Sequence, residues 1–288
     1  MDLAVRKSVA ILNDKGDISQ VEELVKEALL INRNVDVGQD YFDDVSGRLL
    51  RTFQATSKTR FPTVFPFHNK ELDGGLSRKE LAMVVAPPGV GKSLYLVNQG
   101  ATSILNGDNV LYISCEMSQD KIAGRFDSVL TYLKNATLKQ PQTQLKLKSR
   151  LNEVKTKSNG RLIIKEFPTG LSNVNQIRAL LVQLRLHKDF VPDLIIVDYL
   201  ELLRPNRINR QARKVAIITD AELGDSYGKI RPADWVISLN QTKEEYDEGA
   251  MRVYVMKARD ARQHYLINVS VDYSTLQMKE PSSESQAQ

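Results

Sequence analysis

The stretch AMVVAPPGVGKSLYLVNQGATSIL, residues 82–105, constrains the fold more than any other part of the chain. It passes from an apolar run, through a loop rich in Gly and Pro, into a segment whose apolar residues recur at helical spacing. This pattern predicts a buried strand that turns tightly into a helix. A unit of this kind opens an α/β sheet.

The loop within this stretch matches the pattern G-x-x-x-x-G-K-[ST], except that Ala86 replaces the first glycine. Gly89 and Gly91 let successive backbone N–H groups point at phosphate oxygens, and the following helix presents its positive end to them. Lys92 is expected to reach the β and γ phosphates, and Ser93 to ligate Mg²⁺. The sequence therefore predicts a site for ATP and Mg²⁺, with these loop residues: Pro88, Gly89, Val90, Gly91, Lys92, Ser93 and Leu94.

Two acidic residues follow buried strands. Asp198 ends the run LIIVD and is a candidate ligand for Mg²⁺, whereas Asp193 precedes that run and fits a turn. Glu116 in LYISCEMS follows a strand that we expect beside the phosphate-loop strand. By position alone, Glu116 could orient the attacking water or face Lys121 and the helix dipole. The neighbouring Cys115 fits a small core residue, because no histidine is nearby in sequence.

Strands and helices alternate along the rest of the chain, which predicts an α/β fold with a largely parallel sheet. The helix in SNVNQIRALLVQLRLH is expected to have Ser172 as its N-cap, and residues 251–273 read as a closing hairpin. Pro62 and Pro66 interrupt the helical pattern of the first part of the chain. The predicted organisation is a helical appendage over 1–59, an ATPase motor domain over 60–280 and a disordered tail over 281–288.

Composition narrows the class of protein. One cysteine excludes an internal disulfide framework, no apolar run is long enough for a membrane span, and the start does not read as a signal peptide. Residues 134–165 hold nine Lys or Arg against one acid, Glu153, a local surplus of +8 where the whole chain carries +5. A solvated surface and contact with a polyanion both remain open for this insertion. Its basic residues are Lys134, Lys139, Lys146, Lys148, Arg150, Lys155, Lys157, Arg161 and Lys165.

Five segments, in order, carry a resemblance: ELDGGLSRKELAMVVAPPGVGKS, VLYISCEMSQDKIAGRFDS, DLIIVDYLELL, DAELGDSYGKIRPADWVISL and MRVYVMKARD. Over about residues 60–280 the chain resembles the RecA-like motor domain of DnaB-type replicative helicases, particularly phage-like members. The resemblance implies that Glu116 is the catalytic carboxylate and that Lys257 and Arg259 reach the nucleotide of the next subunit. Arg262 is an alternative if the register is shifted.

The same resemblance implies a hexameric ring around single-stranded DNA, in the cytoplasm of a bacterial or phage-infected cell, with primase or a loader as further partners. The N-terminal helix would pack on the adjacent protomer. The central-channel loop of the family falls on a basic run that would contact DNA phosphates. Its residues are Arg204, Arg207, Arg210, Arg213 and Lys214.

The chain departs from the family pattern in two places. About sixty residues precede the motor, which counts against a primase-binding N-terminal domain. About twenty residues stand where the family has a helix and a strand ending in a polar γ-phosphate sensor. Either a segment is missing, which is the expectation we favour, or this variant has lost a core strand. Two other readings stay open: a non-motor ATP-binding assembly or loader, and a RecA-like recombinase.

Overall fold

The computed structural model describes residues 41–50, 60–167, 172–199 and 232–280, together with the single positions 8, 9, 11, 13, 21 and 22. The chain divides into two compact units, Met1–Thr56 and Ser57–Gln288. In the first unit the six single positions and residues 45–50 are helical. The tail over 281–288, predicted to be disordered, lies outside the described residues.

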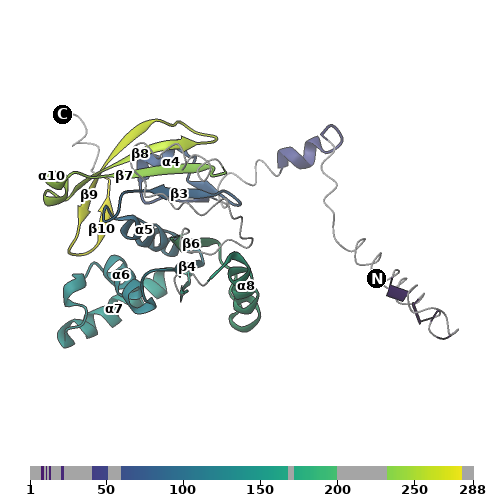
Figure 1. Ribbon diagram of the computed structural model, residues 1–288, viewed down its shortest axis with the longest axis horizontal. Helices are drawn as coiled ribbons and strands as arrows, with labels where there is room; N and C mark the ends of the chain where they lie inside the picture. Colours follow the sequence, from purple (N-terminus) through teal and green to yellow (C-terminus); the bar gives the residue numbers. More distant parts are fainter. Residues whose placement is uncertain are drawn as a thin grey trace, which may run out of the picture. The chain divides into compact units, whose positions relative to one another are not determined.

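The second unit alternates strands with helices, which confirms the α/β class (Figure 1). Its first half contains β1 (Arg60–Phe61), α4 (Pro66–Glu71), β2 (Leu76–Ser77), β3 (Ala82–Val85), α5 (Lys92–Leu105), β4 (Val110–Ser114) and α6 (Gln119–Thr131). Its second half contains η1 (Asn135–Thr137), α7 (Pro141–Lys157), β5 (Leu162–Glu166), α8 (Val174–Lys188), β6 (Leu194–Asp198), β7 (Trp235–Asn240), α10 (Lys243–Asp247), β8 (Ala250–Ala258), β9 (Tyr265–Asp272) and β10 (Gln277–Lys279).

The strands form two main sheets. One is parallel, in the order β5-β4-β6, and the other has the order β10-β9-β8-β7-β3, in which β3 and β7 are parallel and the remaining pairs antiparallel. The expectation that β4 lies beside the phosphate-loop strand β3 is wrong, because β4 pairs with β5 and β6. Within the described residues, β3 pairs only with β7 and β6 only with β4. Among the described strands, β3 and β6 therefore each lie at the edge of a sheet.

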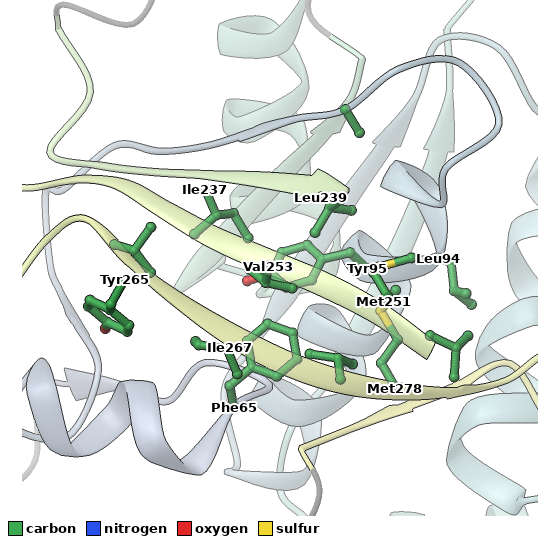
Figure 2. Close-up of a cluster of buried hydrophobic side chains, with 14 of the residues drawn as sticks. Phe65, Leu94, Tyr95, Ile237, Leu239, Met251, Val253, Tyr265, Ile267 and Met278 are labelled. Atoms are coloured by element: carbon green, nitrogen blue, oxygen red, sulfur yellow. The ribbon is translucent and has the colours of Figure 1, made fainter. Parts of the chain in front are cut away.

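Helix α5 connects the two sheets through two hydrophobic clusters. Leu94 and Tyr95, near its start, pack with the side chains of β7, β8 and β9. Figure 2 shows both residues beside Met251 of β8. Further along, Val97 and Ala101 belong to a second cluster with β4, β6 and α6. Because α5 begins at the phosphate loop, packing on both sheets holds that loop in place.

Helix α8 begins one residue later than the sequence indicated. Asn173, not Ser172, is the N-cap: its side chain accepts a hydrogen bond from the N–H of Gln176 at 3.2 Å. The Gln176 side chain in turn accepts from the N–H of Asn173 at 3.0 Å, which completes a capping box. Both Ser and Asn are good caps, so the reciprocal partner decides between them. Among the described helices, none combines the length and hydrophobicity needed to cross a bilayer.

Candidate nucleotide site

The phosphate loop joins β3 to α5 in the conformation that its glycines predict. Gly89 has φ 82° and Gly91 has φ 112°, and Gly91 is the N-cap residue of α5. Both angles lie in the left-handed region, which a residue with a Cβ rarely adopts. The first turn of α5 contains no acidic residue, so the positive end of its dipole is not neutralised locally. The loop is therefore suited to receive an anion.

Asp198 lies at the carboxyl end of β6 and is 3 % exposed. The hydroxyl of Tyr112, on β4, donates a hydrogen bond to Asp198 Oδ2 at 2.7 Å. Burial raises the pKa of Tyr112, and the Asp198 charge raises it further, so the hydroxyl keeps its proton. The N–H of Cys115 donates to the Asp198 carbonyl at 2.8 Å. Burial also raises the pKa of Cys115, again with a smaller effect of Asp198, as expected for a core thiol.

Glu116 follows β4 and is exposed. The Ser114 hydroxyl fixes the turn that carries it, since it donates to the Met117 carbonyl at 2.6 Å and accepts from the Met117 N–H at 3.0 Å. Ser114 pairs with Asp198 in the parallel sheet. Glu116 and Asp198 therefore lie at the same end of the β5-β4-β6 sheet, where the carboxyl ends of β4 and β6 meet.

A contact between Lys92 and Tyr199 links the phosphate loop to the carboxyl end of β6. The Lys92 ammonium lies 5.1 Å from the centre of the Tyr199 ring, and Tyr199 directly follows Asp198. This distance is within the range of a cation–π interaction. Ser93, next to Lys92, and Asp198 supply hydroxyl and carboxylate oxygens, the hard donors that Mg²⁺ prefers. The donor set thus fits a magnesium ion bound together with a phosphate.

Lys257 and Arg259 are at the opposite end of the sheet from the phosphate loop. Trp235 pairs with Ala82, the first residue of β3, and with Ala258 on its other side. The loop follows the last residue of β3, about 13 Å away at a rise of ~3.3 Å per residue. Lys257 Nζ donates to the Ala233 carbonyl at 2.5 Å. The structure does not bring these two cations to the phosphate loop of their own chain.

The guanidinium of Arg259 forms an ion pair with Asp234, with 2.5 Å between Arg259 Nη1 and Asp234 Oδ1. The other carboxylate oxygen of Asp234 accepts the N–H of Leu81 at 2.9 Å. Arg259 is nevertheless exposed over 60 % of its side chain. The alternative residue, Arg262, lies over the Tyr265 ring at 5.5 Å. Arg259 is thus held from one side and open to solvent on the other.

The predicted DNA-contacting residues lie outside the described part of the chain and stay a prediction: Arg204, Arg207, Arg210, Arg213 and Lys214.

Gln241 follows β7, the strand next to the phosphate-loop strand. Its side-chain amide donates to the Ala250 carbonyl at 2.5 Å and to the Tyr273 hydroxyl at 2.6 Å.

Comparison with known proteins places this site in a family. A model of the DnaB-like helicase C-terminal domain matches residues 63–223, which include the phosphate loop, Glu116 and Asp198. The chain belongs to the DnaB-like helicase family. This confirms the resemblance drawn from the sequence.

Similar proteins agree with this membership. A DnaB-like replicative helicase of Enterobacteria phage T4 is 34 % identical over 194 residues, which are 67 % of this chain and 40 % of the phage protein. A DNA repair protein RadA of Rickettsia conorii is 36 % identical over 106 residues, 36 % of this chain and 22 % of that protein. The DnaB-like chain therefore spans less than half the length of these relatives.

Two solved structures share the fold. A DnaB-like replicative helicase, solved in connection with its interactions with primase, superimposes with a TM-score of 0.66 at 17 % identity, over 96 % of this chain and 76 % of that one. A separately solved ATPase domain gives 0.64 at 16 % identity, over 85 % of this chain and 100 % of that one. The DnaB-like chain thus has the RecA-like ATPase fold.

Sequence reasoning missed three residues that contact the predicted site residues. Tyr112 contacts Asp198, Tyr199 contacts Lys92, and Asp234 contacts Arg259. A signal existed for Tyr112, because a buried tyrosine hydroxyl in an apolar strand needs a partner. Identifying that partner requires the order of the strands, which the local pattern does not give.

Proposed function

We propose that this DnaB-like chain is the motor of an ATP-dependent replicative DNA helicase. Pro88 to Leu94 bind the triphosphate, and Ser93 with Asp198 hold Mg²⁺, which supplies neutralisation of phosphate charge when bound. Glu116 orients or deprotonates the attacking water. Subunits form a ring, a hexamer by family resemblance, that encloses single-stranded DNA in the cytoplasm of a bacterial or infected cell.

The position of Arg259 carries the proposal. Arg259 and Lys257 are a strand length away from the phosphate loop of the same chain, and Arg259 is largely exposed. A cation placed this way can complete a nucleotide site only in a neighbouring copy. A head-to-tail contact of this kind closes into a ring when the rotation permits. Arginines supplied from a neighbour accelerate phosphoryl transfer by ~10³–10⁵ in other systems.

Mixing two inactive variants tests the shared site. Lys92→Ala removes the phosphate-loop cation and keeps Arg259, whereas Arg259→Ala keeps the loop and removes the arginine offered to the neighbour. In an equimolar mixture about a quarter of the head-to-tail interfaces combine an intact phosphate loop with an intact Arg259. We expect ATPase activity to return in the mixture toward that fraction. A mixture as inactive as its two components would refute the shared site, provided that sizing shows that mixed oligomers form with ATP.

The second candidate is a non-motor ATP-binding assembly or loader. The sequence favours it at one point, because only about twenty residues stand where the family resemblance predicts a helix and the sensor strand. Single-turnover hydrolysis with and without single-stranded DNA separates the two functions. A motor hydrolyses ATP faster with DNA, whereas an assembly protein forms oligomers on ATP without turnover. Contact with primase, as studied for the DnaB-like structural neighbour, belongs to the motor proposal, and so does contact with a loader.

A further inference from the structure

The central part of the basic insertion, residues 141–157, forms α7, which packs against α6 (Figure 1). At 100° per residue, Lys146, Arg150 and Lys157 lie within about 40° of one another on one flank of the helix. Lys148 and Lys155 lie together on the opposite flank, about 160–180° away. The helix thus has two basic flanks on either side of its buried face.

The flank of Lys146, Arg150 and Lys157 adjoins an exposed aromatic residue. Arg150 Nη1 donates to the Thr131 carbonyl at 2.5 Å, and the next residue, Tyr132, ends α6 in the left-handed conformation with φ 58°. Tyr132 is 56 % exposed.

A further cation extends this surface from β10. The Lys279 ammonium lies 5.1 Å from the centre of the Tyr132 ring. Lys134 follows two residues after Tyr132 and is exposed. We name these six residues the Tyr132 surface: Tyr132, Lys134, Lys146, Arg150, Lys157 and Lys279.

None of the cations of the Tyr132 surface forms an ion pair with a carboxylate in the described part of the chain. Its ion pairs involve Arg78, Arg252 and Arg259 and none of the cations of the Tyr132 surface. Glu153 is the one acid on α7, and among the described residues it pairs with none of its neighbours at helical spacing. Like charges four residues apart, such as Lys146 and Arg150, destabilise a helix. A polyanion bound at this flank would offset that repulsion.

We propose that the Tyr132 surface binds single-stranded nucleic acid. A track of cations beside an exposed aromatic ring is the combination that such strands require, because the cations follow the phosphates and a base stacks on the ring. An acidic protein would use the cations but would gain little from the ring. The site goes beyond the proposed motor function, since it needs neither ATP nor a neighbouring subunit.

The test compares two charge-matched variants of the full chain, without nucleotide. Lys146→Glu/Lys157→Glu alters the proposed flank, and Lys148→Glu/Lys155→Glu makes the same change in charge on the opposite flank of the same helix. Anisotropy of a fluorescein-labelled oligo(dT) of about 12 nucleotides, within the site size of single-strand binders, is measured from about 50 to 200 mM salt. We expect the first variant to bind at least ~10-fold more weakly, with a salt slope shallower by about 1.4, since each single-strand phosphate contact contributes about 0.7. Equal losses in the two variants would overturn the proposal.

Tyr132 supplies an independent readout. Tyr132→Ala should lower oligo(dT) affinity by about 5- to 150-fold, the contribution of one stacked base, and Tyr132→Trp should retain it. An oligonucleotide containing 5-iododeoxyuridine should crosslink to the peptide that contains Tyr132, which separates this surface from any contact of residues 204–214. Absence of that crosslink, or competition by polyglutamate as strong as by oligo(dT), would overturn the assignment. Circular dichroism melting confirms that each variant is folded. Because the oligo(dT) assay contains no ATP, its result can be interpreted even if the motor proposal fails.

Discussion

Replacing Tyr112 with phenylalanine removes a single hydroxyl from beneath the predicted metal ligand. That hydroxyl donates to Asp198 Oδ2 at 2.7 Å, and the Tyr112 and Asp198 side chains are almost completely buried. The Tyr112 ring packs edge-on against Phe126, with centroids 5.6 Å apart, so phenylalanine fills the same space. The substitution therefore tests the hydrogen bond with little change in packing.

The expected change in Mg²⁺ affinity follows from the strength of the hydrogen bond between Tyr112 and Asp198. A hydrogen bond to a charged group contributes about 1.5–3 kcal/mol, and loss of a partner that orients a metal ligand lowers metal affinity by about 10- to 100-fold. The two ranges agree, because about 1.4 kcal/mol corresponds to a tenfold change. We expect Tyr112→Phe to raise the Mg²⁺ concentration for half-maximal binding of a fluorescent ATP analogue by about 10- to 100-fold. Binding of the analogue without Mg²⁺ should change little, since the phosphate loop is untouched.

Tyr95→Phe is the matched control. Tyr95 is 1 % exposed in α5, and its hydroxyl donates to Gln99 Oε1 at 3.5 Å, with no link to Asp198. The Tyr95→Phe variant should lose a buried hydroxyl without a change in the Mg²⁺ concentration for half-maximal binding of the ATP analogue. An Mg²⁺ titration of Tyr112→Phe that overlays the parent and the Tyr95 control would show that Tyr112 does not position Asp198. Recovery of turnover at high Mg²⁺ would instead indicate that the chemical step itself is intact.

Three further predictions concern other contacts. Asp234→Asn keeps a hydrogen-bond acceptor but loses the charge that holds Arg259. The kcat for ATP hydrolysis with DNA should fall by up to ~100-fold because the Arg259 guanidinium is misplaced, while the affinity for an ATP analogue stays unchanged. Burial lowers the pKa of His68 to about 4. The buried neutral imidazole therefore contributes fully to the free energy of unfolding above the unfolded-state pKa of ~6.5, and this contribution, about 3 kcal/mol in total, should be lost as the pH falls from there toward 4. Urea titrations at about pH 7 and pH 5, on either side of the unfolded pKa, should show a smaller loss in His68→Gln. Gly75→Ala should lower the urea midpoint by more than Gly107→Ala, because both have positive φ but only at Gly75 would a Cβ overlap a backbone carbonyl, that of Phe61.

Local sequence pattern was enough for the strands that carry the candidate site residues. The apolar runs before the phosphate loop and before Asp198 became β3 and β6, and Asp198 ends its strand as expected. The order of parallel strands was not readable in this way. Strands buried on both faces have similar apolar sequences, so their order depends on how each crossover passes over the sheet. The wrong neighbour for β4 and the unrecognised role of Tyr112, whose partner is 86 residues away, have this one cause.

The strand register also places Lys257 and Arg259 away from the phosphate loop of their own chain. β3 delivers the phosphate loop at its carboxyl end, and its parallel neighbour β7 begins beside the start of β3. β8 runs antiparallel to β7, so its last residues return to that same starting end, where Asp234 meets Arg259. No rotamer of Arg259 covers the length of a four-residue strand and reaches the loop as well. An arginine at this position is therefore either a surface residue tied to Asp234 or a group offered to another copy. The Lys92 and Arg259 mixing experiment distinguishes these two roles.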